Sequence, residues 1–336
     1  MAALLLTTMA GTASARSWRI NSHAARKAHF LDINAACSSE DVVDGDTLYL
    51  DPGCDITSIQ TLSKRLTLIG TGTSGQAHQA AILSQRLYVT AAGAKVEGLY
   101  LTGGDLCPQA NDIVVERCYV NCNLHTNGTT AQSVTIRQCQ INGQILGIGA
   151  TDTRTQGWTI ENCLVFSGSY EAIKQLYTPT IRNCYVRNTS SSTSASSYGY
   201  CLRNLGNAII TNNIILNKNL DRNYANLTNC TMTNNVISRA EDTEFPDNTF
   251  LNSDYTDAEP LIFTFEGNEQ DYRLKDGSLA AGVGVEGEDC GPFAGAYPYV
   301  PYCLPYGIPY FTHATASSRP TDGKVSINHQ VTIQKQ

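Results

Sequence analysis

The chain has 336 residues and a net charge of −7, and only 16% of its residues are charged. The negative balance argues against a general nucleic-acid-binding protein, because such proteins need a basic surface. No apolar run reaches the roughly 18 residues that a membrane-spanning helix requires, so we expect no transmembrane segment.

Residues 1–15 have the pattern of a secretory signal peptide. A short apolar core ends in Ala13-Ser14-Ala15, small residues of the kind at which signal peptides are cleaved. The basic residues that usually precede such a core are missing. We therefore predict export to the periplasm, the cell surface or the medium, with a disordered N-terminus as the alternative.

Residues 16–46 are expected to form a polar lead-in followed by a capping helix. The segment 29–39 predicts a short helix with one apolar face, made of Phe30, Ile33, Ala36 and Cys37. Asp44-Gly45-Asp46 then predicts a turn into a strand at 47–50. A helix at this place would cover the open end of the structure that follows it.

Residues 47–238 contain a repeated motif of the form Ile-x-Asn-Cys/Asn-x-Ile/Val. Its clear copies begin at Val96, Val115, Ile136, Ile160, Ile181, Ile210 and Met232. Successive copies start 19 residues apart (Val96 to Val115) to 29 residues apart (Ile181 to Ile210). A period of this size with irregular insertions indicates a solenoid, and we predict roughly nine coils in this region.

Each position of the motif predicts a side-chain direction. The first position is apolar and should point inward, because strand residues alternate between the two faces. The third position favours Gly and Asn, which accept positive φ, so we expect a left-handed turn there. These residues are Gly98, Arg117, Gln138, Asn162, Asn183, Asn212 and Asn234. The fourth position should point inward again, and its residues are Leu99, Cys118, Cys139, Cys163, Cys184, Asn213 and Asn235.

The twelve cysteines of an exported protein would ordinarily suggest disulfides. Four of them share the inward fourth position, where side chains in register point the same way, so we expect stacked free thiols there. Cys37 with Cys54 and Cys290 with Cys303 are candidate bridges. No Cys/His spacing in the sequence predicts a zinc site.

Residues 239–336 leave the repeat and are expected to form a C-terminal cap and tail rather than a separate enzyme domain. The segment 271–282 reads Asp-Tyr-Arg-Leu-Lys-Asp-Gly-Ser-Leu-Ala-Ala-Gly. A Pro- and Tyr-rich stretch follows at 297–310, and an exposed strand is predicted at 325–333.

The chain resembles the secreted bacterial right-handed parallel β-helix proteins of the pectin-lyase-like superfamily. The rung motif carries the resemblance, together with the helix, turn and strand of residues 29–50 and the segment 271–282, in which Leu279 replaces the usual Pro. The resemblance implies an all-β, right-handed parallel β-helix with caps at both ends. The family contains lyases, hydrolases and adhesins, so the fold does not assign an activity.

A cluster of cations is the sharpest candidate for a site. Residues 172–220 contain no Asp or Glu, but they contain Lys174, Arg182, Arg187, Arg203 and Lys218. Lys174 precedes Arg203 by 29 residues, the spacing of Ile181 and Ile210, so the two should lie side by side on adjacent coils. Such cations repel unless an anion lies beside them. An anionic glycan would supply that anion, and ordinary surface is the alternative. The candidate ligand-binding residues are Tyr170, Glu171, Arg187, Tyr198, Tyr200 and Arg222.

Lys174 and Arg203 also fit the catalytic roles that the resemblance implies for a lyase, in which β-elimination needs a base and a group that neutralises the uronate carboxylate. The lyase signatures, their calcium-binding aspartates and the glycosidase motifs are not recognisable, however, and hydrolysis would need two paired carboxylates. The acidic residues Glu241, Asp242, Glu244 and Asp247 could hold calcium, but they match no calcium-loop pattern and are typical of a solvated loop. We therefore expect no cofactor, with calcium as the alternative.

Two outward columns have a structural interpretation beside a functional one. Charges of opposite sign should pair across neighbouring coils in the column Glu97, Glu116, Arg137, Glu161 and Arg182. The outward tyrosines could bind sugar faces or pack half-buried, and they are Tyr100, Tyr119 and Tyr185.

These observations predict an exported β-helix protein that contacts extracellular polysaccharide, an anionic glycan in particular, without a dedicated catalytic set. One alternative is a polysaccharide lyase that acts on an anionic, uronate-containing glycan through Lys174 and Arg203. Another is a structural or adhesive surface protein that binds another protein. A deep groove lined by Lys174, Arg203 and the tyrosines would favour the first two, and a flat flank would favour the third.

Overall fold

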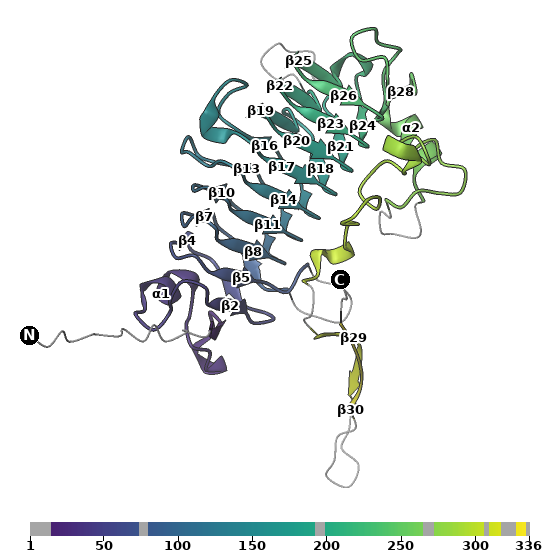
Figure 1. The fold of residues 1–336 in the computed structure, drawn as a ribbon. Coiled ribbons are helices and arrows are strands. Elements are labelled where there is room, and N and C mark those ends of the chain that lie inside the picture. Colours follow the sequence, from purple (N-terminus) through teal and green to yellow (C-terminus); the bar gives the residue numbers. More distant parts are fainter. Residues whose placement is uncertain are drawn as a thin grey trace, which may run out of the picture.

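The structure is a computed structural model that describes residues 15–73, 80–191, 199–264, 272–305, 309–316 and 327–333. The predicted signal peptide, apart from Ala15, lies outside these residues. The regular secondary structure of the described chain is mostly β-strand, and three long parallel sheets contain nearly all of these strands (Figure 1).

The three sheets are named A, B and C. Sheet A has the strand order β1 (Ser17–Ile20), β2 (Thr47–Leu50), β5 (Thr67–Ile69), β8 (Lys95–Glu97), β11 (Val114–Glu116), β14 (Thr135–Arg137), β17 (Thr159–Glu161), β20 (Thr180–Arg182), β23 (Ile209–Thr211) and β26 (Thr231–Thr233). Sheet B has the order β3 (Asp55–Ile56), β6 (Ile82–Leu83), β9 (Tyr100–Leu101), β12 (Tyr119–Val120), β15 (Gln140–Ile141), β18 (Leu164–Ser167), β21 (Tyr185–Asn188), β24 (Ile214–Asn217), β27 (Val236–Ile237) and β28 (Thr249–Phe250). Sheet C has the order β4 (Gln60–Leu62), β7 (Leu87–Val89), β10 (Leu106–Pro108), β13 (Leu124–His125), β16 (Ile145–Leu146), β19 (Ile173–Tyr177), β22 (Leu202–Gly206) and β25 (Tyr224–Thr228).

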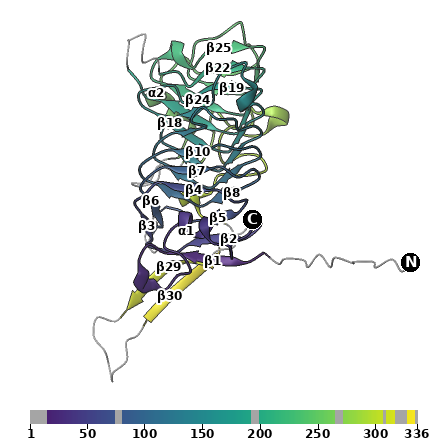
Figure 2. The same cartoon turned by 90° about the vertical axis from the view of Figure 1, so that its left-hand side faces the viewer.

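The chain visits sheets A, B and C in turn and then returns to sheet A one strand further along. This topology is that of a parallel β-solenoid, as the repeat predicts. The register follows the motif, since Val115 pairs with Val96 on one side and with Ile136 on the other. Figure 2 shows the resulting column of strands from the side of sheet C.

The inward positions of the motif form the core, as predicted. The first-position residues Val96, Val115, Ile136, Ile160, Ile181, Ile210 and Met232 are all buried. Trp158 lies two residues before one of these positions and is fully buried, and its indole N–H donates to the carbonyl oxygen of Ala131 at 2.7 Å. Burial of the apolar inward column supplies the main stabilisation of each coil.

The predicted left-handed turns are present between sheets A and B. Every third-position residue has positive φ, from 48° at Arg117 to 63° at Gly98. Gly, Asn and similar residues tolerate this conformation, which explains why the column is rich in Asn. We call these seven residues the turn column.

The inward cysteines stack as predicted. Cys118, Cys139, Cys163 and Cys184 are completely buried, and each thiol donates to the carbonyl oxygen two residues earlier at 3.2 Å. Asn213 continues the stack and accepts a hydrogen bond from the backbone of Cys184 at 2.9 Å. All twelve cysteines of the chain are free thiols, so neither Cys37–Cys54 nor Cys290–Cys303 is bridged.

The N-terminal end of the solenoid is covered by helix α1 (Ile33–Ser38). The helix begins at Ile33 rather than at His29, because the side chain of Asp32 caps it by accepting a hydrogen bond from Ala35 N at 2.7 Å. The expected apolar face is buried at Ile33, Ala36 and Cys37. The lead-in before it contains β1, which the sequence pattern does not predict, and a short 3-10 helix, η1 (Ala24–Arg26).

The C-terminal residues run along the side of the solenoid. Helix α2 (Tyr255–Ile262) and residues 272–305 lie beside sheet B and the turn column (Figure 1). The segment contacts Asn234 through Val283 and reaches Thr73, whose backbone N–H donates to Tyr302 O at 2.8 Å. It contains the 3-10 helices η4 (Val285–Gly287) and η5 (Pro301–Cys303). We call residues 272–305 the C-terminal strap.

The predicted C-terminal strand belongs to a two-stranded antiparallel hairpin. Strand β30 (Ile327–Ile333) pairs with β29 (Pro309–Ala316), and a register shift lies between Phe311 and His313. Figures 1 and 2 both show the hairpin projecting beyond the N-terminal end of the solenoid.

Candidate functional site

The candidate cation pair lies on the outward face of sheet C. Lys174 in β19 is the register partner of Arg203 in β22, so the predicted adjacency is confirmed. Each follows a completely buried residue, Ile173 or Leu202, which fixes the outward direction of the charged side chain. Leu146 in β16 precedes them in the same column, and Ala225 follows.

A carboxylate of the chain itself lies between the two cations. Glu171 binds Lys174 Nζ through Oε2 at 2.9 Å and Arg203 NH1 through Oε1 at 2.6 Å. The expectation that an external anion must relieve the repulsion is therefore corrected, since Glu171 already does so. Glu171 lies directly before the stretch without acidic residues, and it precedes the first residue of β19 by two positions, which places it close to Lys174 on the same coil.

The three charges make one electrostatic unit. Burial works against the charged form of Glu171, but the hydrogen bonds from Lys174 and Arg203 outweigh it and hold the pKa of this carboxyl below its usual range. Two cations and one anion leave a net charge of +1 (2 − 1) on the unit. The Lys174 and Arg203 side chains keep 20% and 27% of their surface exposed, so they can still contact a ligand.

Tyrosines flank this unit. The Tyr200 ring lies 5.3 Å from the guanidinium of Arg203. Tyr170 is 55% exposed, while its backbone carbonyl accepts hydrogen bonds from Ser167 Oγ at 2.7 Å and Asn188 Nδ2 at 2.6 Å. A rigid backbone therefore presents an exposed ring. Tyr198 lies outside the described residues.

Two other candidate residues occupy different surroundings. Arg222 ends the 3-10 helix η3 (Leu220–Arg222), and its carbonyl oxygen accepts from Cys201 N at 3.1 Å, just before β22. Arg187 lies instead on sheet B, where it binds Glu259 of α2 at 2.7 Å and covers the Phe166 ring at 4.4 Å. This corrects the expected grouping of Arg187 with Lys174, because proximity in sequence does not determine which sheet a residue joins.

A second polar cluster on sheet C is not predicted by the sequence. Asp105 Oδ2 lies 2.7 Å from Arg86 NH2 and 3.1 Å from His125 Nε2, while its Oδ1 accepts from the backbone and side chain of Asn123. Burial opposes the charge of Asp105, but these hydrogen bonds outweigh it and lower its pKa. Leu106 pairs in register with Leu124, so Asp105 and His125 lie on adjacent coils two register positions apart, and no motif in the sequence connects them.

The same cluster contains a buried thiol. Cys107 Sγ lies 3.9 Å from His125 Nε2, and burial raises the pKa of this thiol to about 12. His125 Nδ1 accepts from Asn127 N at 3.0 Å, so a neutral imidazole carries its proton on Nε2, toward Asp105. Both ring nitrogens are thus engaged, and the thiol is neither exposed nor ionised. The arrangement does not provide a nucleophile.

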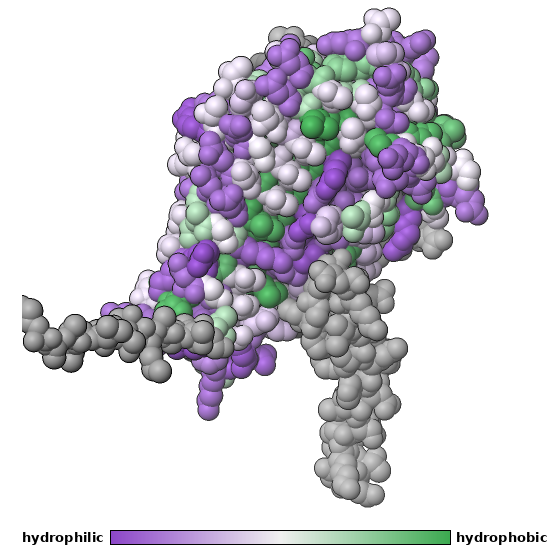
Figure 3. Space-filling model, viewed as in Figure 1, coloured by the Kyte–Doolittle hydropathy of each residue, from purple (hydrophilic) through white to green (hydrophobic). Residues whose placement is uncertain are grey.

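The charged column of sheet A forms the predicted ion pairs, and Figure 3 shows hydrophilic surface as a band across the face that bears this sheet. Glu116 pairs with Lys95 at 2.8 Å and also with Arg137, and Glu161 pairs with Arg182 at 2.6 Å. The carboxylates are buried rather than solvated, since Glu116 and Glu161 are 5% and 3% exposed. This column is therefore a closed structural network.

The outward tyrosine column is also largely covered. The rings of Tyr100 and Tyr119 meet edge to face with centroids 5.2 Å apart. Tyr185 is completely buried under α2 and the strap, and its hydroxyl donates to Glu259. Tyr185 therefore contributes to packing and does not form an open aromatic platform.

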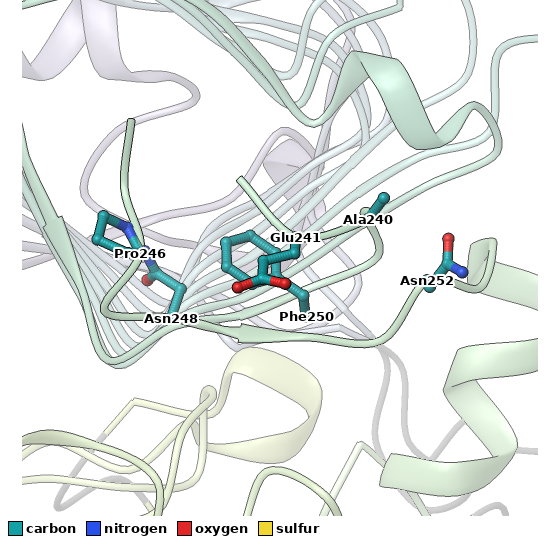
Figure 4. A pocket seen from close by; sticks show the side chains of 6 residues that line it. All are labelled: Ala240, Glu241, Pro246, Asn248, Phe250 and Asn252. Atoms are coloured by element: carbon teal, nitrogen blue, oxygen red, sulfur yellow. The ribbon is translucent and has the colours of Figure 1, made fainter. Parts of the chain in front are cut away.

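A pocket of about 420 Å³ lies at the C-terminal end of the solenoid (Figure 4). Its lining residues are Ala240, Glu241, Pro246, Asn248, Phe250 and Asn252. The neighbouring acid Asp242 pairs with Arg239 at 2.8 Å and accepts from Tyr224 Oη at 2.7 Å. Within the described residues, no three His, Cys, Asp or Glu side chains are arranged to hold a metal ion.

None of the helices in the described parts of the chain has the length and apolarity that a membrane span requires. Comparison with known proteins gives no relative, since no family model, curated protein or solved structure matches the chain.

Proposed function

We propose that this protein is exported and contacts extracellular polysaccharide, preferably an anionic glycan, through the outward face of sheet C. The observation that carries the proposal is the unit of Lys174, Arg203 and Glu171. Its net charge of +1 (2 − 1) stands out in a chain of net charge −7. Its two cations are spaced by one strand separation, about 4.8 Å, along a regular surface that suits an extended chain.

The exposed ring of Tyr170 supports a sugar ligand in particular. It lies directly before Glu171, and its backbone is fixed by Ser167 and Asn188. Aromatic rings bind the apolar faces of sugars, and a fixed backbone reduces the conformational entropy that is lost on binding. Tyr200 beside Arg203 extends the same surface.

The alternative of a uronate lyase has less support. Lys174 is engaged with Glu171 at 2.9 Å, so as a base for β-elimination it would have to release this contact and lose a proton. Arg203 could neutralise a uronate carboxylate, but it is bound to the same Glu171. The third alternative is a structural or adhesive protein. Under this hypothesis, the outward face of sheet C should not bind glycan.

We also propose the finer features of the architecture. The coils should be right-handed, because a crossover between parallel strands of L-residues follows that hand almost without exception. The domain division remains a signal peptide at 1–15, an N-terminal cap at 16–46, about nine coils at 47–238 and a C-terminal cap and tail at 239–336. N-terminal sequencing of the exported protein tests the cleavage after Ala15, and a crystal structure tests the hand.

The function is tested with the chain from residue 16 and a panel of uronate-containing, sulfated and neutral polysaccharides. Isothermal titration calorimetry should detect binding to an anionic member. Lys174→Ala and Arg203→Ala should each weaken it about fivefold, the worth of one partly exposed charge contact. Glu171→Gln should strengthen it, because the unit then carries +2. Arg19→Ala is the matched control, since Arg19 forms a surface ion pair with Asp51 at 2.6 Å near the N-terminal end.

The alternatives give different results in the same experiment. A rise in ultraviolet absorbance from unsaturated products, abolished by Lys174→Ala, would make the protein a lyase. Binding that is unaffected by Lys174→Ala, Arg203→Ala and Glu171→Gln would remove this face from consideration. If no polysaccharide in the panel binds or is cleaved, the structural or adhesive alternative is favoured.

A further inference from the structure

We propose that the pocket at the C-terminal end of the solenoid binds a protonated amino sugar. The pocket is a second site, separate from the glycan surface of sheet C, and it does not depend on the function proposed above. The argument rests on an aromatic floor, a carboxylate without a partner, and a volume that suits a sugar ring.

The pocket arises because the solenoid core ends there. Phe250 in β28 is the register partner of Ile237 in β27, so its ring forms the last layer of that inward column. Ile237 is completely buried, whereas Phe250 is only partly buried. At the opposite end α1 covers the core, but here the cover is the loop of residues 239–248, which joins β27 to β28. The loop leaves the Phe250 ring in the lining of an open pocket of about 420 Å³, a volume that can hold one sugar ring.

The charge of the pocket comes from Glu241. Figure 4 shows its side chain beside the Phe250 ring. In the described part of the chain, the Glu241 carboxylate has neither a hydrogen bond nor an ion pair, whereas the adjacent Asp242 is bound by Arg239 and Tyr224. A carboxylate and an aromatic face both attract a cation, and their combination at one place selects an organic ammonium group.

The remaining lining residues indicate that the ammonium group belongs to a sugar. Asn248 is a structural wall, because its amide donates to Met232 O and Phe245 O at 2.9 Å. Asn252 is exposed at the rim, and its amide can donate to and accept from ring hydroxyls. Phe250 can meet the apolar face of the ring. An amino sugar therefore uses the carboxylate, the amide and the aromatic ring together.

The test compares glucosamine, glucose, N-acetylglucosamine and choline, measured by saturation-transfer NMR and calorimetry at about pH 6, where the free amine is charged. Glucosamine should bind at least about fivefold more tightly than the two uncharged sugars, and the preference should shrink as salt increases. Choline, a cation without ring hydroxyls, should bind more weakly than glucosamine.

Variants assign the binding to the pocket. Glu241→Gln should remove the preference for glucosamine over glucose without changing the fold, since Glu241 is exposed and unbonded in the described residues. Glu244→Gln, in the same loop but outside the lining, should change nothing. Failure of glucosamine to bind, equal binding to Glu241→Gln and wild type, or choline binding as tightly as glucosamine would each overturn the proposal. Lys174→Ala should bind glucosamine normally, which separates this site from the surface of sheet C.

Discussion

Asn162 and Pro292, 130 residues apart, are joined by a hydrogen bond of 3.0 Å from the Asn162 side-chain amide to the Pro292 carbonyl oxygen. The same amide donates to Ala294 O at 2.6 Å. Gln138 likewise donates to Pro298 O at 2.6 Å, and Asn212 Oδ1 accepts from Val285 N at 2.8 Å. The turn column thus has two roles, since its backbone makes the left-handed turn and its side chains hold the C-terminal strap.

Asn162→Gly should lower the free energy of unfolding by about 1–3 kcal/mol, because the buried carbonyl of Pro292 and the partly buried carbonyl of Ala294 lose this donor. Gly keeps the positive φ of 52° without strain, so the change reports on the side chain. The matched control is Asn207→Gly, which has a φ of 51° and an exposed side chain away from the strap. Urea unfolding measures both, and equal losses in the two variants would show that the strap contacts contribute nothing.

The Glu116 carboxylate should make stability depend on pH in the acid range. Burial disfavours its charge, but hydrogen bonds from Lys95 and Arg137 outweigh burial and lower the pKa of Glu116 from 4.5 to about 2. A carboxyl with a depressed pKa in the folded state stabilises the protein above its unfolded pKa and loses this effect as the pH falls through the folded value. The contribution near pH 7 is on the order of 3 kcal/mol.

Glu116→Gln tests this directly by urea unfolding at several pH values. The variant should be less stable than wild type at pH 7, and the gap should close as the pH falls from about 4.5 to about 2. Glu40→Gln is the control, because Glu40 is exposed and forms no ion pair within the described residues, so its replacement should not measurably affect stability. A gap that is independent of pH would rule out the ionisation of Glu116 as its cause.

Arg187 should matter for stability and not for glycan binding. Arg187→Ala leaves the buried Glu259 carboxylate without its cation and removes the cover of Phe166, so unfolding should become easier by about 3–5 kcal/mol. Thermal unfolding monitored by circular dichroism measures the loss, and glycan affinity is measured well below the unfolding temperature. If Arg187→Ala weakens glycan binding and leaves stability unchanged, Arg187 belongs to the ligand site after all. Lys174→Ala is expected to show the reverse pattern.

The stacked thiols should be inert in the native protein. Burial raises the pKa of Cys118, Cys139 and Cys163 well above the usual value, and only the thiolate reacts with alkylating reagents. Iodoacetamide followed by peptide mass spectrometry should label Cys122, which is partly exposed, before any of these three. In urea all of them should react. Native labelling of Cys139 at the rate of Cys122 would contradict the inward stack.

Much of the solenoid could be predicted from the sequence because it depends on local preferences repeated in register. Inward Val and Ile, Asn or Gly at positive φ and stacked cysteines recur at fixed places in each coil, and the structure has all three. The adjacency of Lys174 and Arg203 followed from the same register. The start of α1 was missed although the Asp32 cap is a local contact three residues from Ala35. The strand β1 was missed because it depends on pairing with β2, a distant segment.

The sequence alone determined the coil, its inward columns and the place of the cation pair, because strand alternation and backbone preference act over a few residues. Only the tertiary structure decided what surrounds those residues. It joined Glu171 to both Lys174 and Arg203, and it laid α2 over Arg187 and Tyr185. It also left the Phe250 ring at an incompletely covered end. These contacts join residues that no local period relates, so they follow from the path of the whole chain.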